Sequence, residues 1–222
     1  MAASSPDGLP GVASVFRGSR ALTLPERAHL AARRWSAPWE RVVGALRLDG
    51  SLLLDGGGGP GLLARLLEAR GYLGGYVGVD PDGRKVARAR AWVGESPRRS
   101  FRAGVVGDVP ERGFDQATGV DVLYLLSRPA RPALVAGVVS RLAPGGRVVV
   151  LTSGGGPAWK RTVDRVQERA AALLGVTRGE VVVPCDGAEV AALLSGAGLV
   201  DVRVEDAGAG YAHGFELVSG RS

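Results

Sequence analysis

The run Asp55-Gly56-Gly57-Gly58-Gly59-Pro60-Gly61 lies between two segments of different periodicity. Residues 51–55 are a short apolar run that predicts a buried strand. Residues 61–70 carry leucines at helical spacing and predict a helix. A glycine-rich turn between a strand and a helix is typical of nucleotide-binding loops, because glycine lets the backbone approach a ligand closely and exposes amides at the helix N-terminus.

The glycines of this loop fit two known spacings. One is the dinucleotide pattern G-x-G-x-x-G, which starts at Gly56. The other is D-x-G-x-G-x-G, which starts at Asp55 and includes Gly57, Gly59 and Gly61. The loop alone therefore does not decide which cofactor it binds.

Electrostatics separates the two patterns. A carboxylate at Asp55 would repel the pyrophosphate of a dinucleotide at close range. S-adenosylmethionine instead carries an ammonium and a sulfonium group, and a carboxylate beside the loop helps to hold a cation. Asp55 therefore favours S-adenosylmethionine over NAD. The competing interpretations are a helix cap or a buried turn residue for Asp55, and a plain tight turn for the glycines.

Two further acids follow predicted strands. Asp80 ends a strand, and an acid there can accept hydrogen bonds from both ribose hydroxyls; it could equally be the N-cap of a helix that begins at Pro81. Asp108 ends the next predicted strand, where it can accept from the adenine amino group while the amide of Val109 donates to the ring. A plain turn aspartate is the alternative for Asp108.

Strand and helix patterns alternate through the middle of the chain. The predicted strands span 76–80, 101–106, part of 114–126 and 147–151, and the predicted helices span 81–92 and 130–142. This alternation predicts an α/β fold, in which helices cover both faces of a doubly wound, mostly parallel sheet.

The N-terminal part of the chain lacks this alternation of strands and helices. Residues 1–20 have no period and predict a loose tail. Residues 24–46 predict two helices with a break at Pro38, and Trp35 and Trp39, four residues apart, are expected to be core anchors.

After Thr152 the pattern changes again. The predicted elements are a long helix over 159–173, an extended segment over 181–183, a helix over 187–197 with Asp186 as its N-cap, a half-buried strand over 199–205, and a last strand over 211–218. The short glycine-rich turn between the last two strands requires them to run antiparallel. We therefore expect a single domain over residues 21–222, with residues 152–198 as a substrate-cap insertion.

In their order and spacing, these parts resemble the class I S-adenosylmethionine-dependent methyltransferases. The resemblance covers roughly residues 24–218. Its parts are the loop over 55–61, Val77-Gly78-Val79-Asp80, Gly107-Asp108, Phe114-Asp115 and Leu142-Ala143-Pro144-Gly145-Gly146. It implies a Rossmann-like, seven-stranded sheet with an antiparallel last strand, and S-adenosylmethionine as the cofactor.

The resemblance also assigns the cofactor-binding residues. They are Asp55, Gly57, Gly59, Gly61, Asp80, Pro81, Asp108 and Val109. Asp55, Gly57 and Gly59 would surround the methionine part. Asp80 would bind the ribose, and Asp108 with Val109 the adenine.

A narrower resemblance is to a group of small bacterial methyltransferases of unsettled substrate. It is carried by Arg33-Arg34-Trp35 with Pro38-Trp39, by Asp121-Val122-Leu123-Tyr124-Leu125-Leu126, by segments between Trp159 and Gly179, and by Gly210-Tyr211-Ala212-His213. The chain departs from that group in three places. Gly58 replaces a frequent Cys, Ser153-Gly154-Gly155-Gly156 replaces a more polar, acidic segment, and Phe215 stands where a second histidine would fall.

Methyl transfer is an in-line displacement at a sulfonium carbon, and alignment and exclusion of water can supply much of its rate. An oxygen acceptor can need a base, and His213 is the better candidate because histidine titrates near neutrality. Tyr124, after the fourth strand, could orient the acceptor. The competing interpretations are a packed or surface histidine and a tyrosine bonded to backbone. Lys160 and Arg161 could pair with an anionic substrate, but a solvated helix face is the expected place for them.

Composition narrows the classes of partner. The net charge is +6 and the pI about 10.2, but the arginines are scattered and aromatic residues make up only 5%. A nucleic-acid interface would cluster arginines with aromatics, and Ser127-Arg128-Pro129 replaces the Asn/Asp-Pro-Pro-aromatic motif of enzymes that methylate nucleic-acid bases. We therefore expect no nucleic acid, and the expected cap over the site favours a small-molecule acceptor.

Cysteine and histidine counts bound the metal chemistry and the compartment. A single cysteine, Cys185, excludes a disulfide framework and a multi-thiolate metal site, and with two histidines no metal site is expected. No apolar run reaches the length of a membrane span, and the first eleven residues show no signal pattern. The expected location is the cytoplasm, and Cys185 is expected to be structural.

Three functions remain open on these grounds. The first is an S-adenosylmethionine-dependent methyltransferase that acts on a small molecule, at oxygen by preference. The second is a protein that binds the cofactor but has lost turnover, which the glycines at 154–156 motivate. The third is a nicotinamide-dependent oxidoreductase, which the double fit of the glycine loop motivates.

Overall fold

The computed structural model describes residues 15–16, 21–153, 183–212 and 214–222. The expected helix over 159–173, the glycines at 154–156, Lys160, Arg161 and His213 lie outside the described residues, as does most of the expected tail. The described elements are α2 (Leu24–Ser36), α3 (Trp39–Ala45), β1 (Leu53–Gly56), α4 (Leu62–Ala69), β2 (Tyr76–Asp80), α5 (Gly83–Val93), β3 (Arg99–Ala103), η2 (Val106–Asp108), β4 (Phe114–Val120), η3 (Leu123–Leu125), η4 (Arg128–Ala130), α6 (Arg131–Val139), β5 (Leu142–Ser153), α8 (Gly187–Gly196), β6 (Val200–Asp206) and β7 (Phe215–Arg221).

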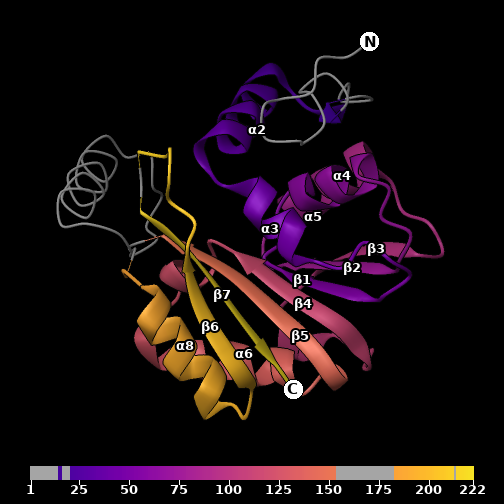
Figure 1. Cartoon of the computed structure of the whole chain (residues 1–222). Coiled ribbons are helices and arrows are strands. Elements are labelled where there is room, and N and C mark those ends of the chain that lie inside the picture. Colours follow the sequence, from indigo (N-terminus) through magenta and orange to yellow (C-terminus); the bar gives the residue numbers. More distant parts are fainter. Residues whose placement is uncertain (1–14, 17–20, 154–182, 213) are drawn as a thin grey trace.

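Seven strands form one sheet in the order β3-β2-β1-β4-β5-β7-β6 (Figure 1). The pairs among β1 to β5 are parallel, whereas β7 runs antiparallel to both β5 and β6. The predicted fold class is therefore confirmed: a doubly wound, mostly parallel sheet whose last strand is antiparallel.

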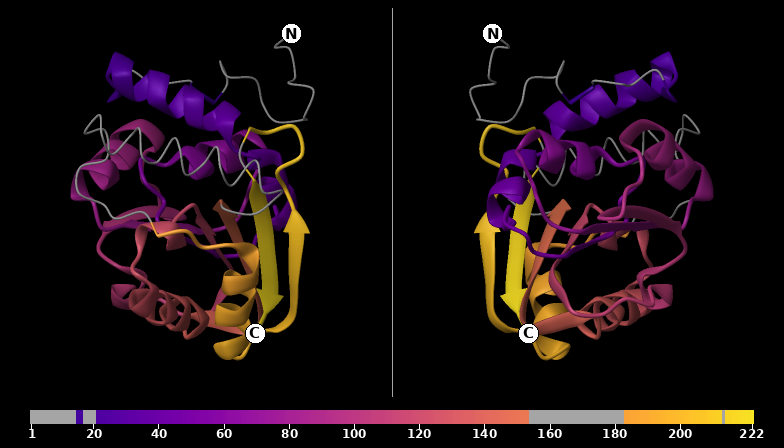
Figure 2. Two further views of the ribbon diagram at one scale, coloured as in Figure 1. Left: turned by 90° about the vertical axis from the view of Figure 1, so that its left-hand side faces the viewer. Right: turned by 90° about the vertical axis from the view of Figure 1, so that its right-hand side faces the viewer.

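Helices cover both faces of the sheet, as two further views show (Figure 2). α3, α4 and α5 lie on one face, and α6 and α8 on the other. Two apolar clusters divide the core in the same way, because successive residues of a strand point to opposite faces. Leu53 and Val149 belong to the first cluster, and their chain neighbours Leu54 and Val150 to the second.

The strand order reverses direction between β1 and β4. The chain proceeds outward through β2 and β3 on one side of β1, and then returns to start β4 on the other side. In doubly wound sheets, ligands bind beyond the carboxyl ends of the strands at such a switch point. The loop over 55–61 begins at this point, since β1 ends at Gly56.

Of the two tryptophans expected to be core anchors, only one is buried. Trp39 is buried and donates a 2.9 Å hydrogen bond from its Nε1 to the carbonyl of Arg33. Trp35 is 56% exposed, and the Arg34 guanidinium lies over its ring. The prediction for Trp35 is wrong because α2 ends at Ser36, so the two tryptophans do not share one helix face.

Three strand predictions also need correction. The last strand, predicted over 211–218, is β7 and begins only at Phe215, because Tyr211 still belongs to the turn, where its amide donates to the carbonyl of Gly208. The strand predicted over 101–106 ends at Ala103, because the chain turns through Gly104 at φ 145° into η2. β6 is an edge strand and is mostly exposed rather than half buried. None of the helices within the described segments combines the length and the apolar character that a membrane span requires.

Candidate functional site

Three glycines give the loop after β1 its shape. Gly57, Gly59 and Gly61 have φ values of 81°, 52° and 90°, in the left-handed region that other residues adopt only under strain. A Cβ at Gly57 would lie 2.3 Å from a methyl group of Val122, and one at Gly61 would lie 2.6 Å from Val93. A Cβ at Gly59 would lie 3.9 Å from its nearest neighbour, Oδ2 of Asp80. A side chain at position 59 would therefore fit there, but it would fill the space beside the loop.

The amides of this loop are engaged within the protein. Gly57 and Gly58 both donate to the carbonyl of Val79, at 2.7 and 3.0 Å, and Gly61 donates to the carbonyl of Gly58. The amide of Gly59 donates to Oδ2 of Asp80 at 3.0 Å. The expectation of amides exposed toward a ligand is therefore wrong for these four residues. Because anion-binding loops use such amides as donors, this arrangement does not favour a pyrophosphate.

Asp55 lies beneath the loop on β1. Its side chain is only 2% exposed, and its Oδ2 accepts a 2.5 Å hydrogen bond from the hydroxyl of Tyr76. Burial raises the pKa of Asp55 to about 7, the hydrogen bond from Tyr76 lowers that pKa, and the charge of Asp80 raises it. Asp55 is thus an acid that changes its charge near neutral pH.

Asp80 ends β2 as predicted, and it is buried. Its Oδ2 accepts from Gly59 and its Oδ1 from the amide of Asp82. The N-cap of α5 is Asp82, which accepts from the amide of Arg84. The alternative interpretation of Asp80 as the N-cap is therefore wrong. A carboxylate oxygen has two lone pairs, so each oxygen of Asp80 can accept one further hydrogen bond, as the two hydroxyls of a ribose require.

The segment expected at the adenine differs in detail from its prediction. Asp108 is exposed and lies in η2, five residues beyond the end of β3. The amide of Val109 donates to the carbonyl of Val106 at 3.1 Å, so the structure gives it a partner other than an adenine ring. Arg141 fixes this turn, because its Nε donates to the carbonyl of Val109 at 2.8 Å.

Of the two residues expected to take part in catalysis, Tyr124 lies in the described part of the chain. Tyr124 lies in η3, four residues beyond the end of β4, and is half buried. Its backbone carbonyl accepts from the amide of Val183 at 2.9 Å. His213 lies outside the described residues.

The residue that directly follows β4 is Asp121, which no sequence pattern predicts as a site residue. Its side chain is 4% exposed and forms a 2.5 Å ion pair with Arg33 of α2. Its φ of 54° is in the left-handed region, and strained backbone of this kind clusters at functional sites. Both residues stand in segments quoted for the narrower resemblance, but 88 residues separate them, and no local sequence signal connects them.

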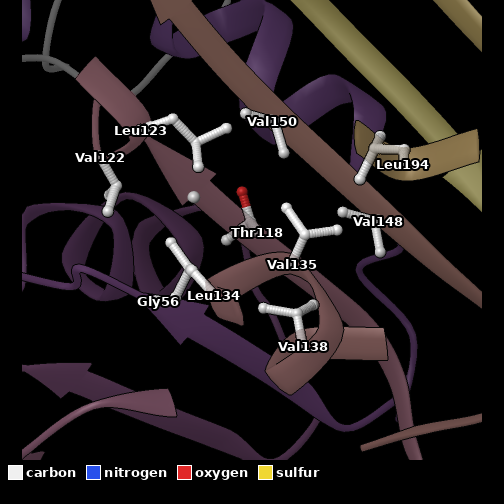
Figure 3. A pocket seen from close by; sticks show the side chains of 11 residues that line it. Gly56, Thr118, Val122, Leu123, Leu134, Val135, Val138, Val148, Val150 and Leu194 are labelled. Carbon is white, nitrogen blue, oxygen red and sulfur yellow. The ribbon is translucent and has the colours of Figure 1, made fainter. Parts of the chain in front are cut away.

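An apolar cavity lies between the sheet and α6, next to Gly56 (Figure 3). Gly56 and Gly119 line it from β1 and β4, Val135 and Val138 from α6, and Leu194 from α8. Asp55, Asp80 and Asp108 are not among its lining residues. Its lining therefore offers a ligand no acidic group.

Cys185 is buried, and burial raises the pKa of its thiol to about 11. A thiol with this pKa stays protonated at neutral pH, and the thiolate is the nucleophilic form. The environment of Cys185 agrees with the structural role expected of it.

Comparisons with solved structures place this architecture among methyltransferases. Human N-acetylserotonin methyltransferase, solved in complex with S-adenosylmethionine, is 20% identical, with a TM-score of 0.65 over 95% of this chain and 59% of that chain. An S-adenosylmethionine-dependent methyltransferase from Mesorhizobium loti is 22% identical, with a TM-score of 0.63 over 84% of this chain and 98% of that chain. The S-adenosylmethionine-dependent methyltransferase SibL is 24% identical, with a TM-score of 0.66 over 93% of this chain and 61% of that chain.

This chain thus spans about three fifths of the length of two of these proteins, and nearly all of the third. No curated protein matches the sequence. The model of a protein family described as a methyltransferase domain matches residues 27–204, which is most of the chain. The match confirms the resemblance: this chain belongs to the methyltransferase domain family and has the class I methyltransferase fold.

Proposed function

We propose that this protein transfers the methyl group of S-adenosylmethionine to a small-molecule acceptor, at an oxygen atom. The observation that carries the proposal is the combination of engaged loop amides and buried acids at the switch point of the sheet. Asp55 and Asp80 offer acceptors and negative charge there, whereas Gly57, Gly58 and Gly59 offer no amide for a phosphate. Such a site suits a cationic adenosyl compound better than an anionic dinucleotide.

When bound, S-adenosylmethionine supplies an electrophilic methyl group on a sulfonium. The residues of this chain would bind and orient the reactants. In this proposal Asp80 accepts from the ribose hydroxyls, Gly59 leaves room for the methionine part, and Asp55 provides a charge beside it. Pro81 and Asp108 keep their expected places beside the cofactor, whereas the amide of Val109, which donates to the carbonyl of Val106, does not serve the adenine.

The proposal about the methyl acceptor rests on fewer observations than the proposal about the methyl donor. The fold is shared with N-acetylserotonin methyltransferase, which is named for a small-molecule acceptor, and this supports a small-molecule acceptor here. The proposal keeps Tyr124 as the residue that orients the acceptor and His213 as the candidate base. It also keeps the cytoplasmic location expected from the sequence.

Transfer of a labelled methyl group tests this proposal. The protein is incubated with S-adenosylmethionine that carries a tritiated methyl group and with separate panels of phenols, carboxylic acids, amines and lipids. We expect label in a phenol or another oxygen acceptor. Label confined to amines would contradict the choice of oxygen. Cofactor binding without transfer to any acceptor would favour a protein that has lost turnover.

A further inference from the structure

The hydroxyl that reaches Asp55 comes from a tyrosine folded along the neighbouring strand. Asp55 on β1 stands opposite Gly78 on β2, and Tyr76 lies two residues before Gly78. A Cβ at Gly78 would lie 3.0 Å from a ring carbon of Tyr76 and 3.3 Å from its hydroxyl. The tyrosine ring therefore occupies the place of a side chain at position 78, and this brings its hydroxyl to the carboxyl group opposite.

Packing holds the ring of Tyr76 in this place. Tyr76 is 3% exposed, and its ring centroid lies 5.6 Å from that of Phe101 on β3. Burial and the neighbouring Asp55 keep the pKa of Tyr76 well above its usual range, so the hydroxyl stays protonated and donates. At all moderate pH values, Tyr76 is thus the donor and Asp55 the acceptor of this hydrogen bond.

The hydrogen bond lies directly against the glycine loop. A Cβ at Gly58 would lie 3.0 Å from Oδ2 of Asp55 and 3.4 Å from the hydroxyl of Tyr76. A larger residue at position 58 would press on this bond. The pair of Tyr76 and Asp55 is therefore in contact with the segment assigned to the methionine part of the cofactor.

Three influences set the charge of Asp55. Burial disfavours the carboxylate, the hydroxyl of Tyr76 favours it, and the negative charge of Asp80 disfavours it. Tyr76 and Asp80 are the titratable groups that face Asp55 from β2, and β4 places Thr118, which does not titrate, at the paired position. With a pKa of about 7, Asp55 is close to half ionised at neutral pH, and the hydrogen bond from Tyr76 keeps that fraction from falling further.

We propose that Tyr76 is a positioning residue for the methyl donor: its hydroxyl holds Asp55 beneath the loop and favours the ionised form that attracts the cationic methionine end. The inference rests on the proposed function, since it requires that the donor bind at this loop. It adds that binding of the donor is coupled to loss of a proton from Asp55, and that Tyr76 sets the pH at which this occurs.

The test compares the wild-type protein with Tyr76→Phe by calorimetric titration between pH 6 and pH 8.5. Three probes are used: S-adenosylmethionine, S-adenosylhomocysteine, which keeps the ammonium but lacks the sulfonium, and 5′-methylthioadenosine, which lacks both cations. Tyr72→Phe is the matched control, because the hydroxyl of Tyr72 donates to the carbonyls of Ser51 and Gly75 instead.

At pH 7 we expect Tyr76→Phe to bind S-adenosylmethionine about five- to tenfold more weakly than the wild type, because a hydrogen bond to a charged group is lost. The difference should shrink as the pH rises and Asp55 ionises in both proteins. Titration of the ligand itself cancels in this ratio of affinities. Binding of 5′-methylthioadenosine should change less than twofold, and Tyr72→Phe should bind like the wild type.

Two results would overturn the inference alone: a ratio of affinities that is the same at every pH, or an equal loss for 5′-methylthioadenosine. A wild-type protein that binds neither S-adenosylmethionine nor S-adenosylhomocysteine would overturn the proposed function as well. If Tyr76→Phe does not fold, wild-type protein made with 3-fluorotyrosine replaces it. This more acidic hydroxyl should move the pH dependence to lower pH, and an unchanged profile would refute the inference.

Discussion

Asp55 makes the stability of the protein depend on pH. Burial raises its pKa to about 7, so the folded state binds this proton more tightly than the unfolded chain does. A carboxyl group with a raised pKa stabilises the folded state while it is protonated. That stabilisation is fully present below the pKa of the unfolded chain and is lost as the pH rises through about 7.

Replacement of Asp55 by Asn tests this dependence. The amide has a similar shape and can still accept the hydrogen bond of Tyr76, but it does not titrate. We expect the free energy of unfolding of the ligand-free wild type to fall between pH 5 and pH 8, relative to Asp55→Asn, by on the order of 3 kcal/mol. Urea denaturation at several pH values measures it. Parallel profiles for the two proteins would contradict the burial of a titrating acid at this position.

Gly57 and Gly59 are both left-handed, but they should respond differently to alanine. Gly57→Ala would place a methyl group 2.3 Å from Val122, whereas the methyl group of Gly59→Ala would meet no atom closer than 3.9 Å. We expect Gly57→Ala to lower the free energy of unfolding by more than about 2 kcal/mol, and Gly59→Ala by about 1 kcal/mol. Gly59→Ala should instead weaken binding of S-adenosylmethionine. Equal losses of stability with unaffected binding would count against the space assigned to the cofactor.

α2 is anchored to the rest of the protein near both of its ends. Near its start, Glu26 pairs with Arg88 of α5 at 2.8 Å. Near its end, Arg33 pairs with the buried Asp121 beyond β4. The first pair is largely exposed and stabilises little, so the attachment of α2 over the carboxyl edge depends more on the second.

Arg33→Gln and Asp121→Asn test this attachment as a double-mutant cycle. Asparagine tolerates the left-handed backbone of position 121, so Asp121→Asn removes the charge without adding backbone strain. We expect Arg33→Gln to lower the free energy of unfolding by about 1–3 kcal/mol, because it removes the cation beside a buried carboxylate. The double variant should lose less than the sum of the single variants. Strictly additive losses, with unchanged hydrogen exchange in α2, would refute the role of this pair.

The elements were predictable where the sequence has a strong period or a clear cap. Asp186 caps α8 as predicted, and the break before Pro38 separates α2 from α3. The exposure of β6 was not predictable, because alternation in a sequence does not reveal that a strand lies at the edge of a sheet. The pairing of Arg33 with Asp121 was not predictable either, because it depends on where α2 lies relative to the carboxyl end of β4.

The glycine loop and the alternation of strands and helices were enough to predict a doubly wound sheet. The number of strands, seven, is the number that the family resemblance implies. The site was only partly predictable. Asp55 and Asp80 could be placed from their positions at strand ends, but the engaged amides of the loop and of Val109 depend on three-dimensional contacts. A signal for Tyr76 was present, since it precedes Asp80 by four residues on one strand and so shares its face.

The central claim concerns the whole molecule: its acidic edge prefers a cationic adenosyl compound to an anionic dinucleotide. Calorimetric titration of the wild-type protein with S-adenosylmethionine and with NAD tests this preference most directly. The account predicts saturable binding of S-adenosylmethionine and no measurable heat of binding with NAD. Tight binding of NAD without a response to S-adenosylmethionine would contradict it.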